Sequence, residues 1–425
     1  MRSTHPFLFC ACVTALASTA LSSIAGCTAS PPSGRPPMGG DAGPGAPPPG
    51  YDAGPGTVTP PPPPPDGCST SAGMDYDMDG FPNGVDCNDC APQINPGAFD
   101  ESGNGIDEDC DGADSAGDVC DTGLPMAPGS PEEAARALGL CRMATGSSWG
   151  VVSARFTTAD GSAAPPSSMQ IGLLPSFGSS NAPREGASML ALSSGVARAP
   201  GQPGYTTECD YFEEFSPRSS FPPTFPQESS SCPGVRSGAV YDSVALEVTI
   251  RVPTNALGFS FSSSFFTYEY PEFICDEFND FFAVLRQDAA GSWQNIVFDE
   301  DNNPVSVNNS LLRACAPGMA GGKVFDCPLG RGPLGGTGFG ADSLCGTPGG
   351  GDPYGGGGGA TSGQEAGGGT GWLRTVAPVT GGETITLRFA IWDSGDPDLD
   401  STALVDAFRW ELDPVMVTET VPDII

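Results

Sequence analysis

The chain has 425 residues, and its 51 Asp and Glu against 17 Lys and Arg give a formal net charge of -34. This charge excludes nucleic acid and anionic lipid headgroups as electrostatic partners. Its 60 glycines and 45 prolines exceed average usage, so part of the chain is expected to be linker or loop.

Residues 1–26 have the pattern of an export signal. Arg2 precedes an apolar run of small residues that ends in "SIAGC" at residues 23–27, and the run is short for a permanent transmembrane helix. The sequence "IAGC" resembles the lipobox of bacterial lipoproteins. The resemblance implies that Cys27 is the lipidated first residue of the mature protein and, with Thr28 after it, that the protein goes to the outer membrane. An ordinary secretory signal cleaved nearby is the alternative.

Residues 27–67 are predicted to be a tether. They are almost all Pro, Gly, Ala, Ser and Thr, and they include six consecutive prolines at 60–65. Proline favours extended polyproline II and nothing here can bury a core, so the segment is expected to hold a domain away from a membrane.

Residues 68–120 form an acidic module. No Lys or Arg occurs between Arg35 and Arg136, and apolar residues are scarce, so the module cannot fold by apolar burial alone. Two twelve-residue windows, "DYDMDGFPNGVD" from Asp75 and "DEDCDGADSAGD" from Asp107, carry acids at positions 1, 3, 5 and 12 with glycine at position 6.

This spacing is the ligand arrangement of an EF-hand-type calcium loop, in which position 7 contributes a backbone carbonyl. The predicted Ca²⁺ ligands are Asp75, Asp77, Asp79, Phe81, Asp86, Asp107, Asp109, Asp111, Ala113 and Asp118. Position 12 is Asp rather than Glu and no amphipathic helix flanks either window, so a helix–loop–helix unit is not expected. A solvated acidic linker is the alternative, but two windows with identical spacing disfavour it.

The residues between the windows add "DCND" at 86–89, "NPGA" at 95–98 and "GIDEDCDG" at 105–112. Together, residues 75–112 resemble the MopE-type metal-binding motif of bacterial surface proteins, which implies metal binding. In that pattern one cysteine follows the first acid cluster and one lies in the second, which implies a Cys87–Cys110 disulfide. The family name is associated with copper, but the mature chain has no histidine, and hard oxygen ligands favour calcium.

The next element, "SPEEAARALGLC" at residues 130–141, is predicted to be a helix. Ser130 can cap it, Pro131 suits its first turn, and Glu133 completes a capping box.

The rest of the chain has strand patterns. In "YDSVALEVTIRV" apolar residues alternate from Val244 to Val252, and "TITLRFAIW" alternates from Ile385 to Ile391. Residues 130–425 are therefore predicted to be a mainly β fold, an antiparallel, jelly-roll-like β-sandwich. The glycine-rich insertion at 316–371 is expected to be a flexible surface excursion, because no phosphate-binding motif fits it.

Two blocks, "FSFSSSFFTYEYPEFICDEFNDFFAVL" at 259–285 and "LRFAIWDSGDPDLDSTALVDAF" at 387–408, resemble the signatures of the choice-of-anchor L domain. Upstream, "ALGL", "WGVVSA" and "LSSGVARAP" also resemble its members. The resemblance spans roughly residues 132–413 and implies an exported β-rich protein fixed to a surface, with no catalytic activity.

These blocks also supply four acids at strand ends, Glu269, Asp280, Asp393 and Asp400. If their strands are neighbours, the four carboxylates form a second kind of calcium site at the sandwich rim. The alternative is that they cap turns and accept hydrogen bonds from backbone amides.

Twelve cysteines remain after removal of the signal and lipidation of Cys27, and an even number in an exported chain predicts up to six disulfides. Connectivity cannot be read from the sequence. Pairing of neighbours predicts Cys120–Cys141, Cys209–Cys232, Cys275–Cys315 and Cys327–Cys345, and leaves Cys68 with Cys90.

Two functions follow from these features. The first is a non-enzymatic, lipid-anchored surface protein whose calcium-stiffened module presents a β-sandwich for adhesion or for binding a protein or glycan. The second is a secreted hydrolase that acts on glycans through paired carboxylates, Glu269 with Glu272 or Asp280. Without histidine in the mature chain, a Ser-His-Asp mechanism is not available.

Overall fold

The computed structural model describes residues 71–423, except 118, 164–166, 207–214, 216–217, 310 and 341–366. All of these residues belong to one compact unit, Gly56–Ile425. The predicted export signal and tether lie outside the described residues. No helix in the described part is long and apolar enough to cross a membrane.

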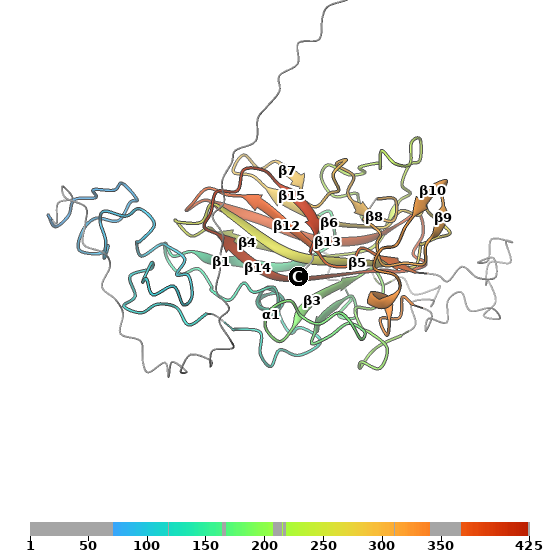
Figure 1. Ribbon diagram of the computed structural model, residues 1–425, viewed down its shortest axis with the longest axis horizontal. Helices are drawn as coiled ribbons and strands as arrows, with labels where there is room; N and C mark the ends of the chain where they lie inside the picture. Colours follow the sequence, from blue (N-terminus) through green and yellow to red (C-terminus); the bar gives the residue numbers. More distant parts are fainter. Residues whose placement is uncertain are drawn as a thin grey trace, which may run out of the picture. The chain divides into compact units, whose positions relative to one another are not determined.

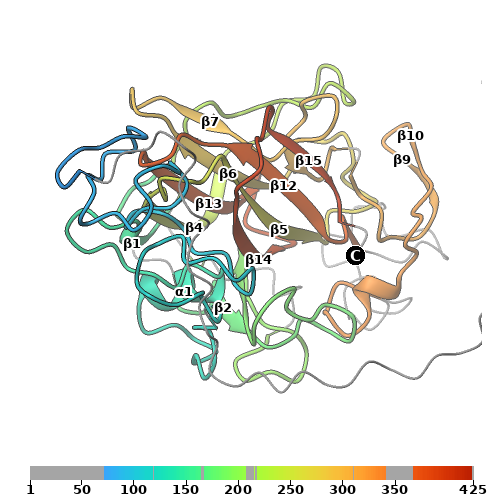
Figure 2. The same ribbon diagram turned by 60° about the vertical axis from the view of Figure 1, so that its left-hand side comes forward.

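The fold is mainly β, as predicted, and every strand pair is antiparallel. One sheet has the order β1 (Gly150–Thr157), β4 (Val240–Arg251), β13 (Thr384–Ser394), β6 (Phe281–Gln287) and β7 (Trp293–Asn295), with β8 (Val305–Ser306) also on β6. The second has the order β15 (Glu419–Pro422), β12 (Leu373–Pro378), β5 (Gly258–Thr267), β14 (Ser401–Glu411), β3 (Met189–Ser193) and β2 (Ile171–Leu174), with β11 (Gly368–Gly369) on β5. Figures 1 and 2 show these strands from two sides.

The main core lies between the two sheets. The predicted apolar row of β4, which runs from Val244 to Val252, and the row of β13, from Ile385 to Ile391, both belong to it. Phe261 of the second sheet meets Phe389 of the first edge to face, with ring centroids 5.4 Å apart. The alternation in the sequence therefore correctly predicted which faces of these strands are buried.

Helix α1 (Pro131–Ala137) closes part of this core with its alanines and Leu138. Ser130 caps it as predicted, since its hydroxyl accepts a hydrogen bond from the Glu133 N–H at 3.3 Å. The helix is shorter than the predicted 130–141, because Gly139 has a φ of +96° and directs the chain away.

The first part of the glycine-rich insertion is ordered, which corrects the prediction of a flexible excursion. Residues 318–325 form a hairpin of β9 (Gly318–Ala320) and β10 (Lys323–Phe325), and the short helix η1 (Gly332–Leu334) follows. Leu334 and Phe339 are completely buried against Phe266 of β5. Apolar anchors between the glycines therefore hold this segment to the sandwich, and residues 341–366 lie outside the described part.

The disulfides Cys87–Cys110 and Cys120–Cys141 are confirmed. The predicted Cys209–Cys232, Cys275–Cys315 and Cys327–Cys345 pairs are wrong, because the bonds are Cys232–Cys275 and Cys315–Cys327. Strand order brings Cys232 to the loop after β5, which neighbour pairing along the chain cannot anticipate. Cys90 is also in a disulfide, while Cys68, Cys209 and Cys345 lie outside the described residues.

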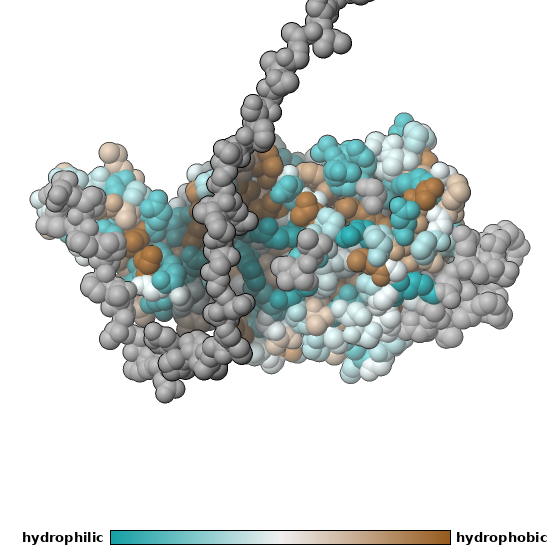
Figure 3. Space-filling model, viewed as in Figure 1, coloured by the Kyte–Doolittle hydropathy of each residue, from teal (hydrophilic) through white to brown (hydrophobic). Residues whose placement is uncertain are grey.

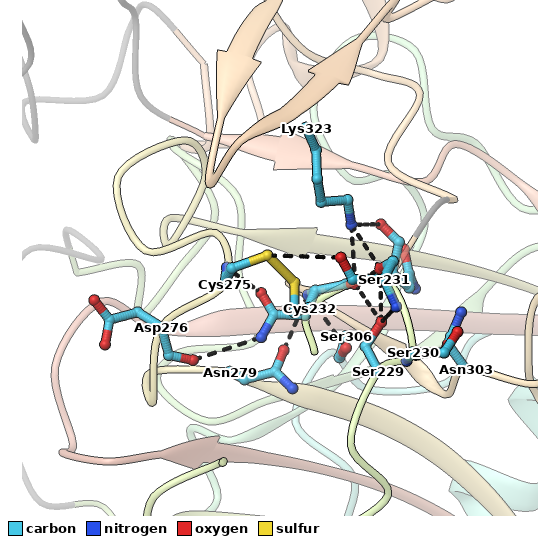
Figure 4. Close-up of a disulfide and its surroundings, with 12 residues drawn as sticks. Ser229, Ser230, Ser231, Cys232, Cys275, Asp276, Asn279, Asn303, Ser306 and Lys323 are labelled. Carbon is cyan, nitrogen blue, oxygen red and sulfur yellow. Dashed lines mark hydrogen bonds between the residues drawn. A yellow bond between two sulfur atoms is a disulfide. The ribbon is translucent and has the colours of Figure 1, made fainter. Parts of the chain in front are cut away.

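Lys323, the chain's single lysine, supports the Cys232–Cys275 bond from β10. Its Nζ donates hydrogen bonds to the Ser231 hydroxyl at 2.8 Å and to the Asn308 carbonyl at 3.1 Å (Figure 4). On the face of the molecule shown in Figure 3, hydrophilic and apolar residues are intermixed.

Candidate metal centre

The acidic module is attached to the sandwich through "NPGA" and the following Phe99. The Thr254 N–H donates to the Gly97 carbonyl at 2.9 Å, and the Thr254 hydroxyl donates to Asn95 Oδ1 at 2.7 Å. A side chain at Gly97 would place a Cβ 2.9 Å from Thr254, so this approach requires glycine. Trp149 of the sandwich also donates from Nε1 to the Ala98 carbonyl at 2.7 Å. The module is therefore fixed at its centre, and the acidic windows extend to either side.

In the first window, the carboxylates hold the loop in shape with one oxygen each. Asp75 Oδ2 accepts from the Gly80 N–H at 3.1 Å, and Asp79 Oδ1 accepts from the Phe81 N–H at 2.8 Å. Asp86 Oδ1 accepts from the Asn88 N–H at 2.8 Å. Gly80 has a φ of +100°, which explains why position 6 is glycine.

The other oxygens of this window converge without donors. Asp77, Asp79 and Asp86 place ligand atoms within 4.8 Å of one another, and Asp75, Asp77 and Asp89 do the same. Buried oxygens of Asp75, Asp77, Asp79 and Asp86 receive no hydrogen bond. Because a buried carboxylate oxygen needs a donor or a cation, the loop has the arrangement of a cation site.

Crowding and burial raise the pKa of two of these acids. The pKa of Asp86 rises to about 6, mainly through burial and also through the charges of Asp79, Asp77 and Asp89. Burial, with the charges of Asp77 and Asp75, raises the pKa of Asp79. A bound divalent cation would stabilise all of these carboxylates in the charged form.

The second window repeats the hydrogen bonds of the first. Asp107 Oδ2 accepts from the Gly112 N–H at 3.0 Å, Asp111 Oδ1 accepts from the Ala113 N–H at 3.0 Å, and Gly112 has the same φ of +100°. Asp107 and Asp109 form a cluster with Asp100, with ligand atoms within 4.8 Å. Asp111 is exposed and outside that cluster, and Asp118 lies outside the described residues.

One basic side chain does reach this lysine-free module. Arg142, which follows the Cys120–Cys141 disulfide, places Nη1 3.3 Å from Asp109 Oδ2 and stacks over Trp149 at 4.6 Å. A cavity of about 190 Å³ lies here, lined by Phe99, Trp149 and Arg142 together with acids of the second window.

The disulfide Cys87–Cys110 joins the two windows. Cys87 follows Asp86, the last position of the first window, and Cys110 stands between Asp109 and Asp111 of the second. Asp86 with these two sulfurs is another cluster with ligand atoms within 4.8 Å. Because the sulfurs are bonded to each other, they are not thiolates, and oxygen is the available donor.

The four acids predicted at the sandwich rim are all buried. Glu269 is 2 %, Asp280 and Asp393 are 0 %, and Asp400 is 8 % exposed. Burial, then the charges of Asp280 and Asp400, raises the pKa of Asp393 well above its usual range. Burial and the Asp280 charge likewise raise the pKa of Glu269.

Sequence reasoning missed several members of these groups. Asp89 was visible in "DCND", and Asp100 closes the second cluster from the "NPGAFD" side. The charge of Asp242 contributes to the raised pKa of Asp393, and Asp242 was visible at the start of the β4 pattern. Arg142 carried no sequence signal, because only the fold brings it to Asp109.

The comparison with protein families agrees with the geometry of the module. The family model Cu-binding MopE, described as "Putative metal-binding motif", matches residues 86–116. This segment contains most of the second window, the cysteines of the disulfide that joins the windows, and the docking segment at 95–99. No curated protein and no solved structure matches the chain. The chain therefore carries a metal-binding motif of this type on a β-rich fold.

Proposed function

We propose that this chain is a non-enzymatic calcium-binding protein of the bacterial cell surface, in which a lipid on Cys27 anchors a choice-of-anchor L-type sandwich to the outer membrane. The observation that carries the calcium assignment is the set of buried, donor-free oxygens of Asp75, Asp77 and Asp79. The donor set is all oxygen, which favours a hard cation such as Ca²⁺ over copper.

A binding role also agrees better with the burial of the acids than a hydrolase does. A glycosidase needs two carboxyl groups in contact with the scissile bond. Glu269 and Asp280 are 2 % and 0 % exposed, so a glycan has no access to this pair. The cavity beside the second window, with its aromatic and charged walls, instead suits a small polar group of a glycan or a protein ligand.

Calcium binding and folding of the module should be one event, because the windows hold clustered acids without a matching number of cations. Titration of the metal-free mature protein with Ca²⁺ by calorimetry should show binding to both windows. Chelation should make residues 71–117 sensitive to protease, while the sandwich survives. Mg²⁺ should restore resistance poorly, because it demands tighter octahedral geometry.

The double variant Asp75→Ala/Asp107→Ala should behave like the chelated protein. Glu101→Ala is the matched control, because it removes one exposed charge from the same module without touching either cluster. If protease resistance is unchanged both by the chelator and in the double variant, disulfides alone hold the module.

The anchor and the ligand have separate tests. Cys27→Ser should release the protein from membranes, and a variant that stays with membranes after a salt wash would contradict the lipid anchor. Incubation of the calcium-loaded protein with a glycan panel should give retention without cleavage, and cleavage would favour the hydrolase.

A further inference from the structure

At one end of the sandwich, acids continue the apolar rows that face the core. The row of β13 runs through Leu387, Phe389 and Ile391 and then reaches Asp393. In β6 the core residues Phe282 and Val284 are preceded at the same spacing by Asp280. Since side chains alternate along a strand, these acids project toward the interior between the sheets.

Two more acids meet them there. Glu269 follows β5 of the opposite sheet and is close enough to Asp280 for their charges to interact. Asp242 lies at the irregularity where β4 changes register against β13, with a φ of 43°. Asp393 is paired with Tyr241, the neighbour of Asp242, and it follows Trp392, which is paired with Phe281, the neighbour of Asp280. Acids from both sheets therefore meet at one buried place.

Hydrogen bonds satisfy only part of this cluster. Asp280 accepts from the Ser394 N–H at 3.0 Å and from the Ser401 hydroxyl at 2.7 Å, and so links β13 to β14 across the sandwich. Asp393 is 0 % exposed, and the Ser194 hydroxyl and the Asp280 carboxyl lie near it without forming a hydrogen bond of normal geometry. Oε2 of Glu269 is also buried without a donor.

Within the part of the chain that the structure describes, no basic side chain compensates these acids. Among the described residues, no ion pair includes Glu269, Asp280 or Asp393. Burial of several carboxylates without a counter-charge is strongly unfavourable, so they must hold protons or a cation. We propose that Glu269, Asp280 and Asp393 form a second kind of Ca²⁺ site, and that the bound ion joins the two sheets at this end of the sandwich.

The donor chemistry of the cluster favours calcium. Glu269, Asp280 and Asp393 offer only carboxylate oxygens. Calcium binds six to eight oxygens at 2.3–2.6 Å, so ligands on opposite sides of the ion are about 5 Å apart, and water can complete the shell. With only oxygen donors at this place, zinc and copper have no soft ligand.

The fold holds these ligands in position. The loop between β5 and β6 carries Glu269 and Asp280 at its ends and is tied down by the Cys232–Cys275 disulfide. Asn308 accepts from the Cys275 N–H at 2.6 Å and donates its own N–H to Asn279 Oδ1 at 3.0 Å (Figure 4). At the edge of the cluster, a Cβ on Gly195 would lie 1.7 Å from Asp400 Oδ2, so only glycine allows this approach.

The test isolates this site from the module. A module-silenced variant, Asp75→Ala/Asp77→Ala/Asp107→Ala/Asp109→Ala, should retain about one tightly bound Ca²⁺ per chain in metal analysis. Adding Asp393→Asn should remove that calcium, and chelation should lower the melting temperature of the module-silenced protein but not of the Asp393→Asn version. Tb³⁺, which replaces Ca²⁺, should luminesce through Trp392, and Trp392→Phe should reduce this signal without removing the metal.

Asp288→Asn is the matched control, because Asp288 is an exposed acid that caps a turn at Ala290 and Ser292. It should leave the bound calcium unchanged. If Asp393→Asn fails to fold, Glu269→Gln gives the same reading with a smaller change in the core. A module-silenced protein that holds no calcium and melts identically with and without chelator would overturn the proposal and leave a shared proton between Asp280 and Asp393. That result would not affect the module, whose calcium is measured in the unmodified protein.

Discussion

The acidic module and the sandwich rim both concentrate carboxylates, but they keep them in place by opposite means. In the module, carboxylate oxygens accept hydrogen bonds from backbone N–H groups a few residues away and so hold tight turns, with both oxygens of Asp107 used in this way, and the fold consists of loops joined by disulfides. At the rim, the acids sit at the ends of apolar rows, and strands far apart in the sequence bring them together. The local arrangement depends on its turns and cross-links, whereas the arrangement between sheets depends on the core behind it.

Removal of a core ring should give the largest effect and should separate the two regions. Phe389→Ala removes a completely buried side chain that packs on Phe261, and it should lower the free energy of unfolding by about 3–5 kcal/mol. Calcium affinity of the module, measured by calorimetry on the folded protein, should not change. Phe389→Leu keeps most of the volume and should cost clearly less. A loss of calcium-binding free energy in the module as large as the loss of unfolding free energy would show that the module also depends on the core of the sandwich.

The contrast also explains how much the sequence could predict. The faces of β4 and β13, the cap at Ser130 and the ligand spacing of the windows depend on residues close together in the chain. Local periodicity and turn chemistry determine them, so they were predicted. The burial of Asp393 at the rim could also be predicted from the sequence, because Asp393 continues the alternation that buries Ile391.

What failed depends on which strands become neighbours. Cys232 meets Cys275 because the order of the sheets brings the chain before β4 to the loop after β5. The ordered start of the glycine-rich insertion depends on burial of Phe339 against Phe266, a contact that composition conceals. Arg142 reaches Asp109 from 33 residues away. None of these contacts leaves a periodic signal in the sequence.

Removal of the Cys87–Cys110 bond should have the second largest effect, and this effect should be confined to the module. The double variant Cys87→Ser/Cys110→Ser opens a loop with a sequence separation of 23, which corresponds to about 3 kcal/mol of cross-link stabilisation. Because the bond joins the two windows, both should lose calcium affinity in calorimetry, and protease should cut the module at lower concentration. Urea unfolding of the sandwich should hardly change.

The pair Cys315→Ser/Cys327→Ser is the control for this experiment. It removes a bond that belongs to the segment packed on the sandwich. It should weaken that segment and leave calcium binding by the module intact. Equal loss of calcium affinity in both double variants would mean that loss of any disulfide loosens the whole unit.

Replacement of Arg142 should have the smallest effect, and it tests the ion pair that joins the module to the sandwich among the described residues. Its guanidinium lies 3.3 Å from Asp109, on the carboxylate that a cation in the second window would use, so it competes with that cation. Arg142→Met keeps apolar contact with Trp149 but removes the charge. Since the Arg142 side chain is 35 % exposed, the ion pair is partly screened, and the variant should bind Ca²⁺ only about twofold more tightly. The difference should disappear near 1 M salt, where the Debye length falls to about 3 Å. Arg155→Met removes one of the two arginine partners of Glu247 within the sandwich and should leave calcium affinity unchanged at all salt concentrations. Weaker binding in Arg142→Met would show the reverse relation, in which Arg142 and Trp149 shape the second window for its cation and the sandwich supports the module's chemistry directly.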